Sequence, residues 1–146
     1  MNVRPSAIII RENSVLTLRY CYGNQDVYAL PGGNPDPGEC LSAALSRELF
    51  EELEIETVVK EMIFCGEVIW PELNKETLHV VFTTEISSGT PQLNPVHTTA
   101  LEIVWLPINE LQDRLLYPNV GGSIIDFYNK SLTTSHIGVI DQPYIR

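Results

Sequence analysis

Acidic residues are concentrated in one short segment of the chain, from Arg47 to Glu56. The segment reads RELFEELEIE and holds five glutamates in ten residues. Like charges three or four residues apart on a helix destabilise it by about 0.2–0.5 kcal/mol per pair. At about 3.6 residues per turn, Glu48, Glu51 and Glu52 fall on one face of a helix. A divalent cation bound to these carboxylates would turn their mutual repulsion into a shared attraction.

The loop before this segment could supply a further oxygen ligand. It runs from Pro31 to Glu39 and contains three prolines and three glycines in nine residues, which excludes regular structure. Its glycine pair, Gly32 and Gly33, would let a backbone carbonyl approach the acidic face. Carbonyl and carboxylate oxygens are hard ligands suited to Mg²⁺ or Mn²⁺. The alternative is an ordinary solvated acidic face, but in this helix only Arg47 could offset the charge.

The spacing of apolar residues predicts the elements that position these groups. Leucines recur every fourth residue from 41 to 53, which predicts a helix over about 40–54 with one apolar face. Before it we expect two strands within 6–26, with a turn at Asn13 and Ser14, and a short strand at 27–30. After it we expect strands at 56–70, 75–86 and 101–107, a helix from Pro107 through 116, and a last helix at 121–130. Strands and helices mix without strict alternation. The pattern therefore predicts one α/β domain over residues 1–146, with a mixed sheet flanked by helices.

Composition limits the classes of partner. The chain of 146 residues is 44% hydrophobic and carries a net charge of −10. Such a charge argues against binding to nucleic acid polymers or anionic membranes, and an anionic substrate would need a cation as mediator. No apolar run approaches the roughly 18 residues of a spanning helix. We expect no leader in residues 1–10, reduced thiols at Cys21, Cys40 and Cys65, and a cytoplasmic location.

Residues 33–55 resemble the Nudix box of the Nudix (MutT-like) hydrolases. Gly33 is followed by five residues and Glu39, then seven residues and the pair Arg47–Glu48, with Glu51–Glu52 three residues on. Eight of the nine defined positions match over this segment, and Glu54 stands where the family has glycine. The segments ALPGG, at 29–33, and VWLPINEL, at 104–111, also resemble the family.

The resemblance implies an α/β/α sandwich and a hydrolase that uses Mg²⁺ or Mn²⁺ and water. Its substrate would be a nucleoside diphosphate linked to another moiety, such as a nucleoside triphosphate or an ADP-ribose-like nucleotide sugar. Glu51 and Glu52 would be the principal metal ligands, completed by a carbonyl of Gly32 or Gly33. Glu48 would be a further ligand or the general base.

The resemblance also implies roles for residues around the metal ligands. Arg47 would orient Glu48 or its neighbours through a charge-assisted hydrogen bond. Glu39 would begin the helix, in a supporting role or in direct contact with the metal. Many members use a base from a later loop or strand, and Glu102 is the candidate here, with Glu85 as the alternative.

Two questions stay open at this level. A non-catalytic nucleotide sensor on the same fold is the competing function, although no acidic position of the box is lost. Dimers are common in the family, but no segment of the sequence marks an interface.

His79 is expected to be a hydrogen-bonded strand residue, and Trp105 a core residue. Tyr22, Tyr28 and Trp70 could stack on a base but are more often packing residues.

Overall fold

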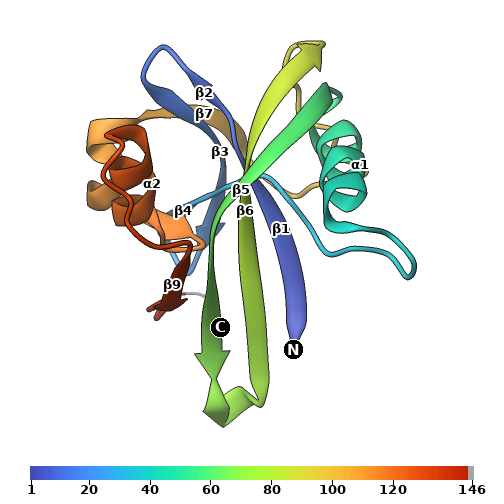
Figure 1. Cartoon of the computed structure of the whole chain (residues 1–146). Helices are drawn as coiled ribbons and strands as arrows, with labels where there is room; N and C mark the ends of the chain where they lie inside the picture. The colour runs from blue at the N-terminus through green and yellow to red at the C-terminus, as the bar shows by residue number, and fades with distance from the viewer. Residues whose placement is uncertain (145–146) are drawn as a thin grey trace.

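The computed structural model describes residues 1–144, which form three layers (Figure 1). Helix α1 (Leu41–Leu53) lies on one side of the β-strands, and helix α2 (Gly121–Tyr128) lies on the other side. This arrangement confirms the α/β class with mixed sheets flanked by helices. The strands form two sheets rather than the one sheet that the sequence predicted.

The four-stranded sheet has the order β1-β6-β5-β9. Strands β5 (Glu56–Trp70) and β6 (Lys75–Ser88) form a long antiparallel ribbon, closed by the 3-10 turn η1 (Pro71–Leu73). Strand β1 (Asn2–Ile8) runs parallel to β6, with Arg4 opposite His79. The last strand, β9 (His136–Val139), runs parallel to β5 and was not predicted from the sequence.

The five-stranded sheet is built around β3 (Ser14–Tyr22). It pairs with the short β2 (Ile10–Arg11), with β4 (Gln25–Ala29) and with β7 (Glu102–Pro107). Strand β8 (Leu115–Tyr117) runs parallel to β4. The predicted strand from residue 6 is therefore divided at Ile9, because the chain leaves one sheet there and enters the other.

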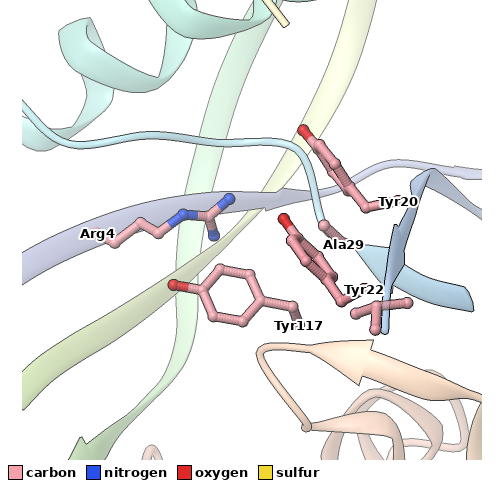
Figure 2. A pocket seen from close by; sticks show the side chains of 6 residues that line it. Arg4, Tyr20, Tyr22, Ala29 and Tyr117 are labelled. Carbon is pink, nitrogen blue, oxygen red and sulfur yellow. The ribbon is translucent and has the colours of Figure 1, made fainter. Parts of the chain in front are cut away.

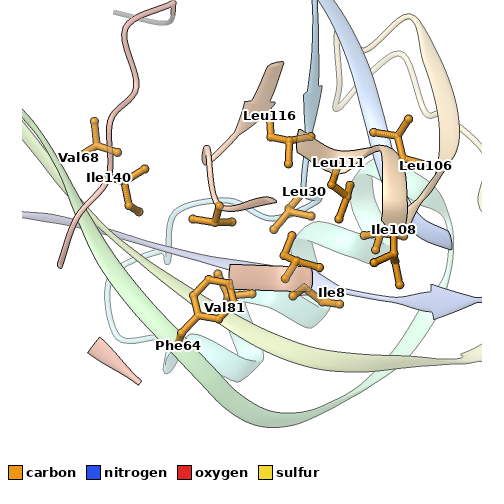
Figure 3. Close-up of a cluster of buried hydrophobic side chains, with 13 residues drawn as sticks. Ile8, Leu30, Phe64, Val68, Val81, Leu106, Ile108, Leu111, Leu116 and Ile140 are labelled. Carbon is orange, nitrogen blue, oxygen red and sulfur yellow. The ribbon is translucent and has the colours of Figure 1, made fainter. Parts of the chain in front are cut away.

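Two apolar clusters lie on opposite sides of β1. Ala7 and Ile9 pack with the buried leucines of α1, at positions 45, 49 and 53. Ile8, between them in sequence, points the other way and packs with Phe64, Val81 and the residues around α2 (Figure 3). Successive side chains of a strand point to opposite faces, so one strand contributes to both cores.

The predicted helix from Pro107 through 116 is wrong. Residues Ile108–Asp113 form a short 3-10 helix, η2, and the chain then extends into β8. Leu116 is buried, and its carbonyl accepts hydrogen bonds from the Tyr144 hydroxyl and the Gln142 side chain. These partners lie far along the chain, so the local pattern could not reveal them. In residues 1–144, no helix is long and apolar enough to cross a membrane.

Candidate active site

Arg47 is the centre of the acidic helix face. Its Nε and Nη2 donate to the two Glu39 carboxylate oxygens, at 2.7 and 2.8 Å. Its Nη1 donates to Glu48 at 3.1 Å and to Glu51 at 3.2 Å, and Nη2 also reaches the Asn34 carbonyl. A planar guanidinium suits such a paired contact with a carboxylate. Arg47 therefore ties the loop before α1 to the acids of α1.

Glu39 has a supporting place in this network. The Arg47 guanidinium and the Asp36 backbone N–H, which donates at 2.7 Å, lower the pKa of Glu39 to about 2. Helix α1 begins at Leu41, after Cys40, so Glu39 precedes the helix instead of starting it. Its contacts favour the supporting role over direct contact with a metal.

Glu52 and Glu48 differ from Glu39 in the direction of their pKa shifts, because burial raises both pKa values. Burial, together with the neighbouring Glu48 charge, raises the pKa of Glu52 to about 7. Burial also raises the pKa of Glu48, although Arg47 opposes the effect. Among residues 1–144, the Glu52 carboxylate has no hydrogen-bond or ion-pair partner. The Arg4 charge opposes the effect of burial on Glu52 only in part, and a half-buried carboxylate in this state favours a bound cation.

Gly32 and Gly33 bring the loop against both β1 and the acids. A Cβ on Gly32 would lie 2.2 Å from the Pro5 carbonyl oxygen, so β1 and the loop could not approach this closely with any larger residue. A Cβ on Gly33 would lie 2.3 Å from the Glu48 Cδ. The Gly33 N–H donates to the Pro5 carbonyl at 3.3 Å. Gly33 therefore lies directly against the Glu48 carboxylate, while the approach of a Gly32 or Gly33 carbonyl to the acids stays a prediction.

The far end of α1 is also fixed by distant residues. Glu54 adopts a left-handed conformation, with φ 57° and ψ 34°, and its N–H donates to the Phe50 carbonyl. The carbonyls of Glu52 and Leu53 accept hydrogen bonds from the backbone N–H groups of Asn94 and Gln92, at 2.9 and 3.0 Å. The helix thus ends where a family glycine would end it, with Glu54 in the strained conformation.

Arg4 is a second cation near the acids, and the sequence reasoning missed it. Its charge lowers the pKa of Glu48 and Glu52, against the larger effect of burial. Its Nη2 donates to the Leu30 carbonyl at 3.1 Å, and its Cζ lies 4.9 Å from the centre of the Tyr117 ring. The only signal in the sequence was an arginine before an apolar run, which is too weak to place it beside a helix that begins 37 residues later.

The two candidates for a base outside the box each form an ion pair with a basic residue of a β-strand. Glu102 is more than half exposed, and Arg19 donates to it from Nε at 3.3 Å. Glu85 is exposed and pairs with Lys60 at 3.5 Å. Among the described residues, neither makes a hydrogen bond or ion pair with a group on α1. Their catalytic role stays a prediction that these contacts do not support.

The structure also places the histidine, aromatic and cysteine side chains that the sequence offered as candidates. His79 is buried, but neither ring nitrogen has a hydrogen-bond partner within residues 1–144, so the expected hydrogen bond is absent. Burial and Arg4 lower the pKa of His79 to about 3. Trp105, Tyr28 and Trp70 pack against the apolar clusters, whereas Tyr22 is nearly half exposed. The three cysteines are free.

The acidic side chains of α1 carry the kind of oxygen atoms that bind a metal ion. Across the described part of the chain, no three acidic, histidine or cysteine side chains are already gathered around a common point. Glu48 and Glu51 instead turn to Arg47, while the Glu52 carboxylate has no such partner. Carboxylates and a nearby glycine loop are the oxygen donors that Mg²⁺ and Mn²⁺ prefer. These residues therefore fit a hard divalent cation, since one oxygen of Glu48, Oε2, and one of Glu51, Oε1, make no hydrogen bond to Arg47.

A family model described as the NUDIX domain matches residues 2–126. The chain belongs to the Nudix family. The match covers strands β1 to β8 and most of α2, so it includes the acidic helix and Arg4. No match was found among curated proteins.

Solved structures of other proteins share the fold of this Nudix chain. The ORF135 protein of E. coli is 24% identical with a TM-score of 0.71, over 88% of this chain and 89% of that one. A Nudix hydrolase from Nitrosomonas europaea is 20% identical with a TM-score of 0.74, over 92% of each chain. An ADP-ribose pyrophosphatase from Streptococcus suis is 16% identical with a TM-score of 0.66, over 96% and 98%. At these identities the likeness concerns the fold.

Proposed function

We propose that this Nudix domain is a divalent-metal-dependent pyrophosphohydrolase. Its substrate is a nucleoside diphosphate linked to another moiety, either a further phosphate or a sugar. The observation that carries the proposal is the Glu52 carboxylate, half-buried beside Glu48 and without an ion-pair partner in the described residues. Membership of the Nudix family and the likeness to a pyrophosphatase support the reaction class.

The roles follow from the contacts of each side chain. Glu52, Glu51 and Glu48 would hold Mg²⁺ or Mn²⁺, with a carbonyl of Gly32 or Gly33. Bound there, the ion supplies neutralisation of phosphoryl oxygens and a lowered pKa for bound water. Glu48, whose own pKa is raised by burial, suits proton removal from the attacking water.

Arg47 and Glu39 act on the site through other residues. The Arg47 guanidinium holds Glu48 and Glu51 on the same side of α1, and Glu39 holds the guanidinium. Glu102 remains the proposed outside base only if a movement brings it to the acids, because Arg19 now pairs with it. Mg²⁺-dependent turnover in a Glu102→Gln variant would remove it from the mechanism.

The test is substitution of Glu52 with glutamine. Release of phosphate or pyrophosphate is measured on a panel of nucleoside triphosphates and nucleotide sugars, with and without Mg²⁺. Glu52→Gln should lower kcat by about 10²-fold or more, since it removes a charge that acts at the reacting centre. Glu56→Gln, the same change at an exposed position on β5, should stay within about twofold of the unchanged protein.

Two outcomes would contradict the proposal. Near-normal turnover in both Glu51→Gln and Glu52→Gln would refute the metal site on α1. A protein that hydrolyses no member of the panel, but binds one of them tightly, would instead be a nucleotide sensor.

A further inference from the structure

A cavity next to the acidic face has an aromatic lining and one unsatisfied cation. Its volume is about 250 Å³, and its lining includes Arg4, Tyr20, Tyr22 and Tyr117 (Figure 2). Pockets that hold whole small ligands have volumes of about 300–1,000 Å³. This cavity therefore suits part of a ligand, with the remainder outside it.

The cavity adjoins the acidic face of α1. Arg4 donates to the Leu30 carbonyl, and the chain continues from Leu30 to Gly33, which touches Glu48. The Arg4 charge also acts on Glu48 and Glu52. A nucleotide with its diphosphate at the acids would thus have its base or sugar within reach of the cavity.

Arg4 has one guanidinium nitrogen with no partner. Nη2 donates to the Leu30 carbonyl, but Nη1 is covered from solvent and has no hydrogen-bond partner among residues 1–144. A buried charged donor left unpaired is costly, so it favours a ligand that offers an acceptor. Its position is fixed by Tyr117, whose ring lies under Arg4 and also meets His79 edge-on at 5.2 Å. His79 is kept neutral by burial and by Arg4, so no second charge competes for the acceptor.

The aromatic side of the cavity suits a flat ring. The rings of Tyr20 and Tyr22 lie nearly parallel, 6.0 Å apart with 19° between their planes. Figure 2 shows them across the cavity from Arg4, with the Tyr22 hydroxyl turned toward the guanidinium. Tyr22 is 48% exposed, so its ring can turn aside to admit a ligand. Nucleobases stack on such aromatic faces.

We propose that this cavity binds the nucleobase of the substrate and that Arg4 selects a guanine-type base over adenine. Guanine presents two neighbouring acceptors, O6 and N7, to which an arginine donates, whereas adenine presents N7 beside an amino donor. The amino group of adenine would meet the Nη1 donor. The inference rests on the proposed function only in taking the ligand to be a nucleotide.

The experiment measures binding of guanosine monophosphate, adenosine monophosphate and ribose 5-phosphate by NMR titration, with the metal removed by a chelator. The unchanged protein should bind the guanosine nucleotide about tenfold tighter than the adenosine nucleotide. Arg4→Met should abolish this preference. Arg11→Met is the matched control, because Arg11 lies over the Trp105 ring at 5.0 Å as Arg4 lies over Tyr117, and it does not line the cavity.

A second variant keeps the test valid if Arg4→Met does not fold. Tyr22→Ala, at a half-exposed position, should weaken both nucleotides several-fold and leave their ratio unchanged. No effect of Tyr22→Ala on either nucleotide would refute binding in this cavity. Equal affinity for the two nucleotides in the unchanged protein would refute the selectivity. Ribose 5-phosphate that binds as tightly as the guanosine nucleotide, and is lost in Arg4→Met, would show that Arg4 contacts phosphate instead.

This measurement is separate from turnover. The Glu52→Gln variant should retain the preference for guanosine monophosphate, because Glu52 does not line the cavity. In the unchanged protein, a preference for guanosine monophosphate without any metal-dependent hydrolysis would refute the proposed function alone. Hydrolysis without base preference would refute the inference alone.

Discussion

At the scale of single residues, the acids were predictable and their cationic partners only partly so. Glu48, Glu51 and Glu52 lie at i, i+3 and i+4 in one helix, so local spacing was enough to place them together. Arg47 is in the same helix and was also found. Arg4 was missed because its place depends on the pairing of β1 with β6, a contact between residues more than seventy positions apart.

Alanine substitutions at the neighbouring Gly32 and Gly33 should separate a loss of stability from a loss of activity. Gly32→Ala should lower the free energy of unfolding by about 1–3 kcal/mol, because the new methyl group would meet the Pro5 backbone. Gly33→Ala should change stability by less than about 1 kcal/mol, since the group it meets is the mobile Glu48 side chain. Its hydrolysis should fall about 10–100-fold as Glu48 moves from its place. Urea unfolding and nucleotide hydrolysis are measured on both variants, and full activity in Gly33→Ala would contradict the role of Glu48.

At the scale of elements, the sequence predicted what has strong local periodicity. The leucine spacing located α1 within a residue or two, and the long apolar strands β5 and β6 were found. The prediction of helix at strand β8 is wrong because its three residues carry no period, and its pairing with β4 decides its conformation. Strand β9 was missed because a strand of four residues is similarly short, and its formation depends on the edge of β5.

The end of α1 offers a test of local strain. Glu54 has a φ of 57°, a conformation that costs a non-glycine residue about 1–2 kcal/mol. Glu54→Gly should therefore raise the free energy of unfolding by about 1 kcal/mol. Glu54→Ala is the control and should give no increase, because alanine meets the same steric cost. Chemical denaturation checks both, and a destabilised glycine variant would show that the glutamate side chain has a stabilising contact.

At the scale of the whole molecule, charge and fold class were readable from composition and pattern, but the division into two sheets was not. The sequence shows Ala7, Ile8 and Ile9 only as an apolar run. Their opposite orientations toward two cores arise from the sheets that form on either side. The net charge of −10 remains consistent with a domain that binds anions through a metal.

The raised pKa of Glu52 makes global stability depend on pH. Its pKa is about 7 in the folded state against an ordinary 4.5, so between these values the folded state binds more protons than the unfolded state. Its contribution to stability should therefore fall as pH rises from about 4.5 to 7. Without metal, the unchanged protein should lose up to about 3 kcal/mol relative to Glu52→Gln across this window.

Urea unfolding at several pH values, with a chelator present, measures the difference between the two proteins. Added Mg²⁺ or Mn²⁺ should restore stability near pH 7.5 in the unchanged protein, by about 2.7 kcal/mol at a metal concentration 100 times Kd. It should have little effect in Glu52→Gln. A difference that does not vary with pH would show that Glu52 is better hydrated than its position indicates.

The backbone hydrogen bonds from Gln92 and Asn94 to the last turn of α1 limit how this helix can be transplanted. The last two carbonyls of the helix, those of Glu52 and Leu53, accept hydrogen bonds from a connection some forty residues downstream, whereas the adjacent Glu54 N–H binds only the Phe50 carbonyl. A chimera that receives only residues 33–55 from a homologue would contain the acids but not the matching connection that binds the last turn of their helix. In chimeras between homologues, the helix and residues 89–95 should therefore be exchanged together, although they are far apart in the sequence.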